Sequence, residues 1–325
     1  MAKLHTSEVR LRPFLQADLE PIVALWNDCL WKDPISLDRF WRLFLLDPNF
    51  NPEGAIVAEI DGKPVGFLQA MVRRTTLGVL SIDPTEGWIT TFFVAPGFRR
   101  QGIGRMLIEA GLEYLVAHGC GRVSCNGYAP IYAFPGVDVE YVEAIALLSA
   151  TGFHPCADAL TMRLPLENVV TPEVVVAERV ALAADGIEVR VFTLADTLPL
   201  LAFAEQHFLH LHQSILEGLQ QDRANVFVAV RRDEVVGFAQ WQNPSTDPPN
   251  GAHGRFGPFG VHPDHRGQGL GSVIFFTVVE HVVARGAETL WFGWAGGRNL
   301  TFYQRAGCEI TRHYQLYQID LASHA

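Results

Sequence analysis

The feature that most constrains the fold of this 325-residue chain is an internal duplication. Segment 90–119 reads TTFFVAPGFRRQGIGRMLIEAGLEYLVAHG, and segment 257–286 reads GPFGVHPDHRGQGLGSVIFFTVVEHVVARG. Matching residues, such as Val94 and Val261, lie 167 positions apart throughout the two segments. A unit that recurs at this distance in a chain of this length predicts two similar domains in tandem.

Each copy has the pattern of a strand, a turn and a helix. A short apolar run at 92–94 or 259–261 predicts a strand, which the following proline ends. Both turns fit Arg-x-x-Gly-x-Gly. An amphipathic helix follows and ends at Gly119 or Gly286, where a glycine cap is expected.

The two glycines of each turn allow a ligand to approach the backbone closely. The first amides of the following helix have no partner within the helix, and the helix dipole favours an anion there. With an arginine at its start, such a turn suits a pyrophosphate group. A single Gly-x-Gly more often only tightens a turn, but two copies in the same setting favour the anion site.

The strand, the Val-x-Pro, the Arg-x-x-Gly-x-Gly and the helix together resemble motif A of GCN5-related N-acetyltransferases (GNATs). A Rossmann fingerprint is the competing interpretation, but neither copy has its third glycine. The resemblance covers nearly the whole chain and implies an α/β fold with a mixed sheet, in two tandem GNAT domains. It also implies that the turn binds the pyrophosphate of acetyl-CoA while the strand holds the pantetheine arm.

Carried over residue by residue, the resemblance implies cofactor contacts in both copies. In the first copy these residues are Phe92, Val94, Arg99, Arg100, Gln101, Gly102, Ile103 and Gly104. In the second copy they are Phe259, Val261, Arg266, Gly267, Gln268, Gly269, Leu270 and Gly271, with Asn299 as a further contact to the pantetheine arm.

Three segments are expected: a first domain at 1–168, a linker at 169–186 and a second domain at 187–325. Matching hairpins precede both motif strands, at 55–67 and 226–238, and Asp61-Gly62 is a turn signal. Within the linker, Pro172 and the pair Asp185-Gly186 predict the two ends of a helix.

The two halves differ in their candidate acids. In the family that the chain resembles, a late tyrosine protonates the departing CoA thiolate, and Tyr303 stands at this place. The alternative for Tyr303 is simple packing against the sheet. The first half has Leu148 at the matching position. We therefore expect the first half to keep an intact CoA motif, and the second half to be the better catalytic candidate. An insertion in the first half carries Tyr128, Tyr132 and Tyr141, any one of which is an alternative acid for that half. The preferred interpretation is that the insertion lines the cleft or packs between domains.

Candidates for the base that deprotonates the substrate amine are Glu86 and His253, which precede their motif arginines by the same distance. For each of them, a solvated position at a strand end is the commoner situation.

Composition excludes several other classes. The formal charge of −10 and the lack of a basic run argue against nucleic acid as a partner. No apolar stretch approaches the length that spans a bilayer, and we expect a cytoplasmic protein without a membrane partner. Five cysteines without a Cys-x-x-Cys pair favour neither disulfides nor zinc, and we expect no metal.

We therefore predict an acetyl-CoA-dependent N-acetyltransferase that acts by direct transfer on the primary amine of a small molecule. Two alternatives stay open: a CoA-binding sensor or scaffold without turnover, and an enzyme that acetylates protein amines.

Overall fold

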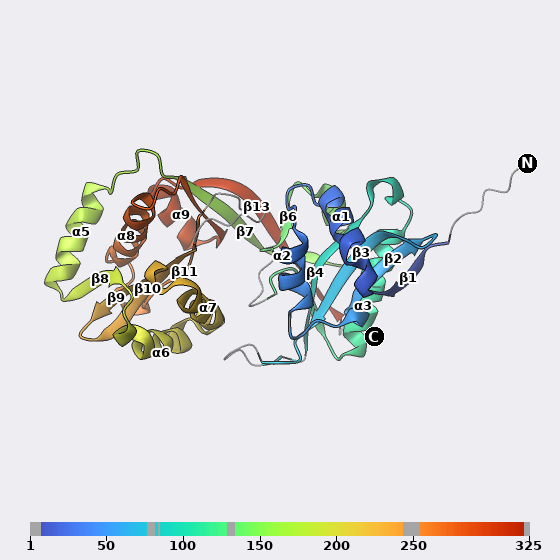
Figure 1. The fold of residues 1–325 in the computed structure, drawn as a ribbon, viewed down its shortest axis with the longest axis horizontal. Helices are drawn as coiled ribbons and strands as arrows, with labels where there is room; N and C mark the ends of the chain where they lie inside the picture. Colours follow the sequence, from blue (N-terminus) through green and yellow to red (C-terminus); the bar gives the residue numbers. More distant parts are fainter. Residues whose placement is uncertain (1–7, 77–81, 84, 129–133, 243–253, 322–325) are drawn as a thin grey trace, which may run out of the picture.

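The computed structural model describes residues 8–76, 82–83, 85–128, 134–242 and 254–321. Two lobes lie side by side and are joined by long strands (Figure 1). The first half of the chain contains β1 (Arg10–Pro13), α1 (Leu19–Cys29), α2 (Leu37–Phe40), β2 (Ala55–Ile60), β3 (Lys63–Val72), β4 (Glu86–Val94), α3 (Ile103–Ala117), β5 (Arg122–Cys125), β6 (Val137–Asp138), α4 (Val142–Ala150) and β7 (His154–Pro165).

After a connecting helix, the second half repeats this order apart from β6, which has no counterpart among its described residues. It contains α5 (Glu173–Ala184), β8 (Ile187–Val191), α6 (Thr197–His207), α7 (His212–Asp222), β9 (Val226–Arg231), β10 (Glu234–Gln242), β11 (Gly254–Val261), α8 (Leu270–Val283), β12 (Thr289–Ala295), α9 (Arg298–Arg305) and β13 (Glu309–Asp320). The predicted hairpins are confirmed as β2–β3 and β9–β10. The predicted linker helix is confirmed as α5.

Over the described residues the strands form one 13-stranded sheet, in the order β1-β2-β3-β4-β5-β13-β7-β12-β11-β10-β9-β8, with β6 beside β13. Most neighbours are antiparallel, but β4 pairs with β5 and β11 with β12 in parallel, so the sheet is mixed as predicted. The pairing of β4 with β5 stops at Ile89. From Thr90 to Val94, this edge of β4 is therefore not paired with β5.

The last strand of each half lies in the sheet of the other half. β13, at the end of the chain, pairs with β5 of the first half, and β7, at the end of the first half, pairs with β12 of the second. β7 and β13 also pair with each other, from His154 to Arg163. Both strands run between the lobes in Figure 1. Exchange of the strands thus makes the two halves one continuous sheet.

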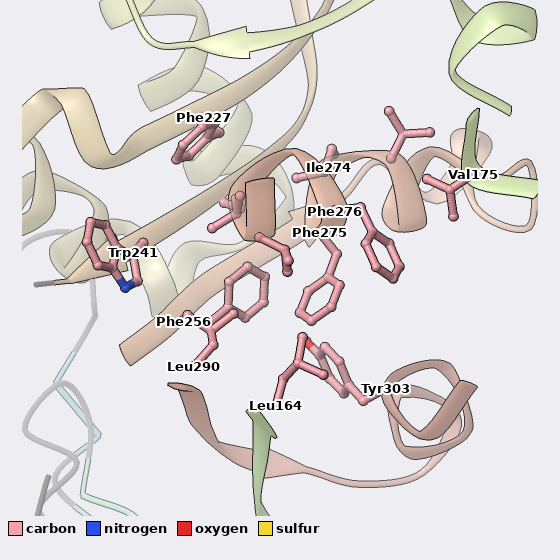
Figure 2. Packing of buried hydrophobic residues seen from close by; sticks show 14 of the residues in the cluster. Leu164, Val175, Phe227, Trp241, Phe256, Ile274, Phe275, Phe276, Leu290 and Tyr303 are labelled. Atoms are coloured by element: carbon pink, nitrogen blue, oxygen red, sulfur yellow. The ribbon is translucent and has the colours of Figure 1, made fainter. Parts of the chain in front are cut away.

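The exchanged strands also complete the two main cores. Tyr317 and Ile319 of β13 are buried with the α3 side chains in the first lobe. Met162 and Leu164 of β7 are buried with α8 in the second lobe. Figure 2 shows Leu164 beside Tyr303 in this second core. Each core therefore contains apolar side chains from both halves of the sequence.

Arg312 of β13 ties the exchanged strand to the first lobe through its side chain. Its guanidinium binds both oxygens of Asp33, with Nη2 2.9 Å from Oδ2, and its Nε donates to Oδ2 of Asp138 at 2.8 Å. All three side chains are at most 16% exposed. An ion pair shielded from water in this way is costly to break from one side only.

Matching ion pairs join the first strand of each half to the start of its first helix. Arg12 binds Asp18 in the first half, and Arg190 binds Asp196 in the second. Asp196 also accepts hydrogen bonds from the backbone and hydroxyl of Thr193. The hydrogen bonds from Arg190 and then from Thr193 hold the pKa of the Asp196 carboxyl well below its ordinary value of 3.8.

Among the described residues, no helix has both the length and the apolar character needed to cross a membrane.

We predict that Arg312→Met lowers the free energy of unfolding by about 3 to 5 kcal/mol, because it leaves the buried carboxylate of Asp33 without its cation and that of Asp138 with Lys32 alone. The matched control is Arg163→Met on β7, whose ion pair with Glu309 is exposed and is expected to contribute less than about 1 kcal/mol. Denaturant titration followed by circular dichroism measures both values. Equal losses in the two variants would contradict the prediction.

We predict that Asp196→Asn lowers the free energy of unfolding by about 1 to 3 kcal/mol at pH 7, because it removes a charge-assisted hydrogen bond. The folded-state pKa is lowered, so the contribution is present above pH 3.8 and is lost as the pH falls through the folded value. Thermal melts of wild type and variant at several pH values should therefore converge in acid. The exposed Glu205 on α6 provides the control variant Glu205→Gln, which should match wild type.

Candidate functional site

A cavity of about 620 Å³ lies in the first lobe, along the edge of β4 that is not paired with β5. Four sets of residues line it: Thr90 to Val94 of β4; Arg99, Arg100, Gly102 and Gly104 of the turn; Glu143, Ala144 and Leu147 of α4; and Phe134, Gly136, Val137 and Asp138 of the insertion. The predicted CoA motif and the insertion therefore meet at one cavity. This confirms the expectation that the insertion lines a cleft.

The turn has the same backbone in both halves. Gly102 and Gly269 each precede the motif helix with φ values of 87° and 82°, in the left-handed region that glycine tolerates best. Nε of Arg99 donates to the carbonyl of Val94 at 3.0 Å, and Nε of Arg266 donates to Val261 at 3.1 Å. The arginine in each copy thus ties the turn to the end of the motif strand.

The packing of Leu147 against Gly104 favours a glycine at this position. A Cβ at this position would lie 2.8 Å from Cδ2 of Leu147 of α4, so any larger residue would have to displace the Leu147 side chain. The close approach brings α4 to the wall of the cavity beside the turn.

A charged network forms another wall of the cavity. It joins three carboxylates, Asp33, Asp138 and Glu140, with two cations, Lys32 and Arg312, and so carries one net negative charge. Burial by itself raises the pKa of Asp138, but donors from the Glu140 backbone, Arg312 and Lys32 outweigh it and lower that pKa below its ordinary value. The Asp138 carboxylate therefore stays ionised at neutral pH.

Two of the residues at this cavity come from the other end of the chain. Tyr314 of β13 lines it, and Arg312 on the same strand holds the carboxylates of its wall. The hydroxyl of Tyr141 donates to Asp33 at 2.9 Å. The site in the first lobe is thus built from both halves of the sequence.

Cys29 is the cysteine that lines this cavity. Its Sγ lies 3.4 Å from the carbonyl of Val94. Burial raises the pKa of this thiol to about 11, against an opposing effect of Arg99. At neutral pH Cys29 is therefore a protonated thiol and a poor nucleophile.

A second cavity, of about 1080 Å³, lies between the lobes. Asp33, Phe134 and Tyr314 line both cavities, so the two adjoin at these side chains. Trp241, Trp291 and Trp294 line the part of this cavity that belongs to the second lobe.

Two predicted residues of the first glycine turn, and the predicted base Glu86, do not line the cavity in the first lobe. Ile103 is buried in the core below α3. Gln101 is exposed, and its Nε2 donates to the carbonyl of Gly97 at 3.4 Å. Glu86 is the first residue of β4, four residues before the part of the strand that lines the cavity. Its role as the base stays a prediction.

The predicted residues of the second half line neither of the two cavities described above. The set comprises Phe259, Val261, Arg266, Gly267, Gln268, Gly269, Leu270, Gly271, Asn299 and Tyr303. Asn299 is exposed on α9, whereas Leu270 is buried. His253 lies outside the described residues.

Tyr303 lies in the core of the second lobe and is 6% exposed. Its ring centroid is 4.2 Å from that of Phe292. It is 5.8 Å from the ring centroid of Phe275, which lies beside it in Figure 2. Burial raises the pKa of its hydroxyl above the ordinary value of 10. Its role as an acid stays a prediction.

Sequence reasoning did not single out Asp33, Arg312 or Tyr314 for this site. The insertion was a usable signal for the segment from Phe134 to Asp138, because it interrupts the repeat. No local signal marks Arg312 or Tyr314, since only the exchange of β13 brings them to the first lobe.

Comparison with known proteins shows two matches to one family. The acetyltransferase (GNAT) family matches residues 18–131 and again residues 192–307. A mycothiol acetyltransferase of Thermomonospora curvata is 31% identical over 223 residues, which cover 64% of this chain and 66% of that protein. The present chain thus spans slightly less than two thirds of that relative.

Solved structures show the same fold. A GCN5-related glucosamine N-acetyltransferase region of a fungal multi-domain β-N-acetylglucosaminidase superposes with a TM-score of 0.81 at 20% identity, over 97% of this chain and 38% of that one. A tandem GNAT protein of the clavulanic acid biosynthesis pathway has a TM-score of 0.65 at 16% identity, over 97% and 99% of the two chains. With both halves matched, the chain belongs to the GNAT acetyltransferase family and carries two GNAT domains in tandem.

Proposed function

We propose that this protein transfers an acetyl group from acetyl-CoA to the primary amine of a small molecule, and that acetyl-CoA binds in the first-lobe cavity. The observation that carries this proposal is the cavity itself, where the edge of β4 and the glycine turn lie together. A thioester cofactor held along that strand edge would have its pyrophosphate at the start of α3.

The amide groups of β4 from Thr90 to Val94 suit the pantetheine arm, because this edge has no ladder with β5. The exposed Gly102 leaves the mouth of the turn open, since a Cβ there would meet no atom within 4 Å. Arg99 and Arg100 add positive charge beside it. These features together support a long, anionic cofactor.

The net negative charge of the network at Asp33 and Asp138 supports a cationic acceptor. The adjoining cavity between the lobes offers room for the remainder of a small molecule. The name of the fungal relative gives glucosamine, a small amine, as its acceptor. An acceptor of this kind could place its amine at the cofactor from the side of Asp33 and Tyr314.

Direct transfer is supported by the state of Cys29. A thiol with a pKa of about 11 is an ineffective nucleophile at neutral pH, so a covalent acetyl-enzyme on this residue is disfavoured. The amine nitrogen then attacks the thioester carbonyl carbon, and the C–S bond breaks. The nitrogen gives up one proton to water, and the thiolate of CoA takes up one proton to leave as a thiol. Tyr141 and Tyr314 are the described tyrosines at this cavity from which that proton could come.

The proposal predicts that Gly102→Glu weakens acetyl-CoA binding at least tenfold, because a carboxylate at the open turn repels the pyrophosphate. Gly102→Gln is the control, since it adds the same bulk and the same strain at positive φ without the charge. Isothermal titration calorimetry measures both variants against wild type. Equal affinities in Gln and Glu variants would contradict a pyrophosphate at this turn.

Activity is tested by release of CoA thiol over a panel of amino sugars, amino acids and polyamines. We expect wild type to release CoA thiol with at least one amine, and Gly102→Glu to release less. Binding of acetyl-CoA without thiol release for any amine or lysine peptide would favour the sensor. Release with lysine peptides alone would favour a protein acetyltransferase.

A further inference from the structure

We propose that Glu178 of the linker helix occupies the second anion site, so that the chain binds acetyl-CoA once, at the first turn. This inference rests on the proposed cofactor. It concerns a difference between two turns whose sequence and backbone are otherwise alike.

Glu178 lies directly over the second turn. A Cβ built on Gly269 would stand 2.6 Å from Cγ and 2.7 Å from Oε1 of Glu178, so the side chain fills the space in front of this glycine. Gly269 is the residue that precedes α8, whose first amides have no partner in the helix. At the second turn, the Glu178 carboxylate therefore occupies the space that is open at the first turn.

The matching position in the first lobe shows the contrast. A Cβ on Gly102 would meet no atom within 4 Å, and Gly102 is exposed whereas Gly269 is half-buried. The linker helix causes this difference, because α5 packs along α8 on the outer side of the second lobe (Figure 1). Val175 and Leu182 of α5 are buried in the core with α8, on the same helical face as Glu178.

The electrostatic state of Glu178 fits this role. Its Oε2 is buried and has no hydrogen-bond partner among the described residues. A buried carboxylate oxygen without a donor is costly unless another charge or dipole compensates it. The positive end of the α8 dipole provides such compensation, as it would for a pyrophosphate. The same property of the turn therefore serves an internal anion.

Two aromatic rings lie beside the second turn. The rings of Phe259 on β11 and Phe302 on α9 stack with centroids 6.1 Å apart. Both rings lie near Gly271, with Phe259 Cζ 3.6 Å and Phe302 Cε2 3.9 Å from a Cβ built there. A probe that lacks the pantetheine arm therefore tests the turn alone, apart from any contact with these rings.

The test uses 3′-phosphoadenosine 5′-diphosphate, the nucleotide part of CoA, with calorimetry on the full chain. Wild type should bind one equivalent, and Glu178→Ala should bind two, because the second turn is then open. Glu173→Ala, which removes an exposed glutamate at the start of the same helix, should still bind one. Thermal melts of the three proteins confirm that α5 remains folded.

Two equivalents bound by wild type, or one bound by a folded Glu178→Ala, would overturn the inference. The fate of the proposed activity is read separately. Wild type that binds one nucleotide yet releases no CoA thiol with any amine would refute the transferase and leave the role of Glu178 intact. Loss of nucleotide binding in Gly102→Glu, but not in Gly102→Gln, assigns the one equivalent to the first turn.

Discussion

The antiparallel pairing of β7 with β13 is the interaction on which the rest of this structure depends. Each strand continues the sheet of the half to which it does not belong in sequence. Their apolar side chains then enter the core of that half, as Ile319 and Leu164 do. Backbone hydrogen bonds, apolar burial and the Arg312 ion pairs thus couple the two lobes through the same two strands.

This coupling also shapes the candidate site. The cavity of the first lobe takes its glycine turn from the first half of the chain and Tyr314 from the last strand. The carboxylates at its wall are neutralised in part by Arg312, which could not reach them if β13 stayed in its own half. The charge at the site therefore depends on the exchange of β13 as well as on the residues of the first glycine turn.

Duplication has left two turns with one backbone and different surroundings. Both glycines have positive φ, and both arginines donate to the end of the motif strand. One turn opens on a cavity, whereas the other faces a glutamate from the linker. The same helix dipole can stabilise a ligand or a side chain, and the neighbour that packs against it decides which.

The repeat, the hairpins, the linker helix and the glycine turns could be predicted from the residues alone, because they depend on local periodicity and on backbone conformations that few residues tolerate. The places of Arg312, Glu178 and Tyr303 were decided only by the tertiary structure. Each depends on contacts between segments far apart in the chain, and a pattern of neighbouring residues carries no information on which distant strand or helix packs against it. The exchange of β7 and β13 is such a contact, because each strand pairs with a strand of the other half.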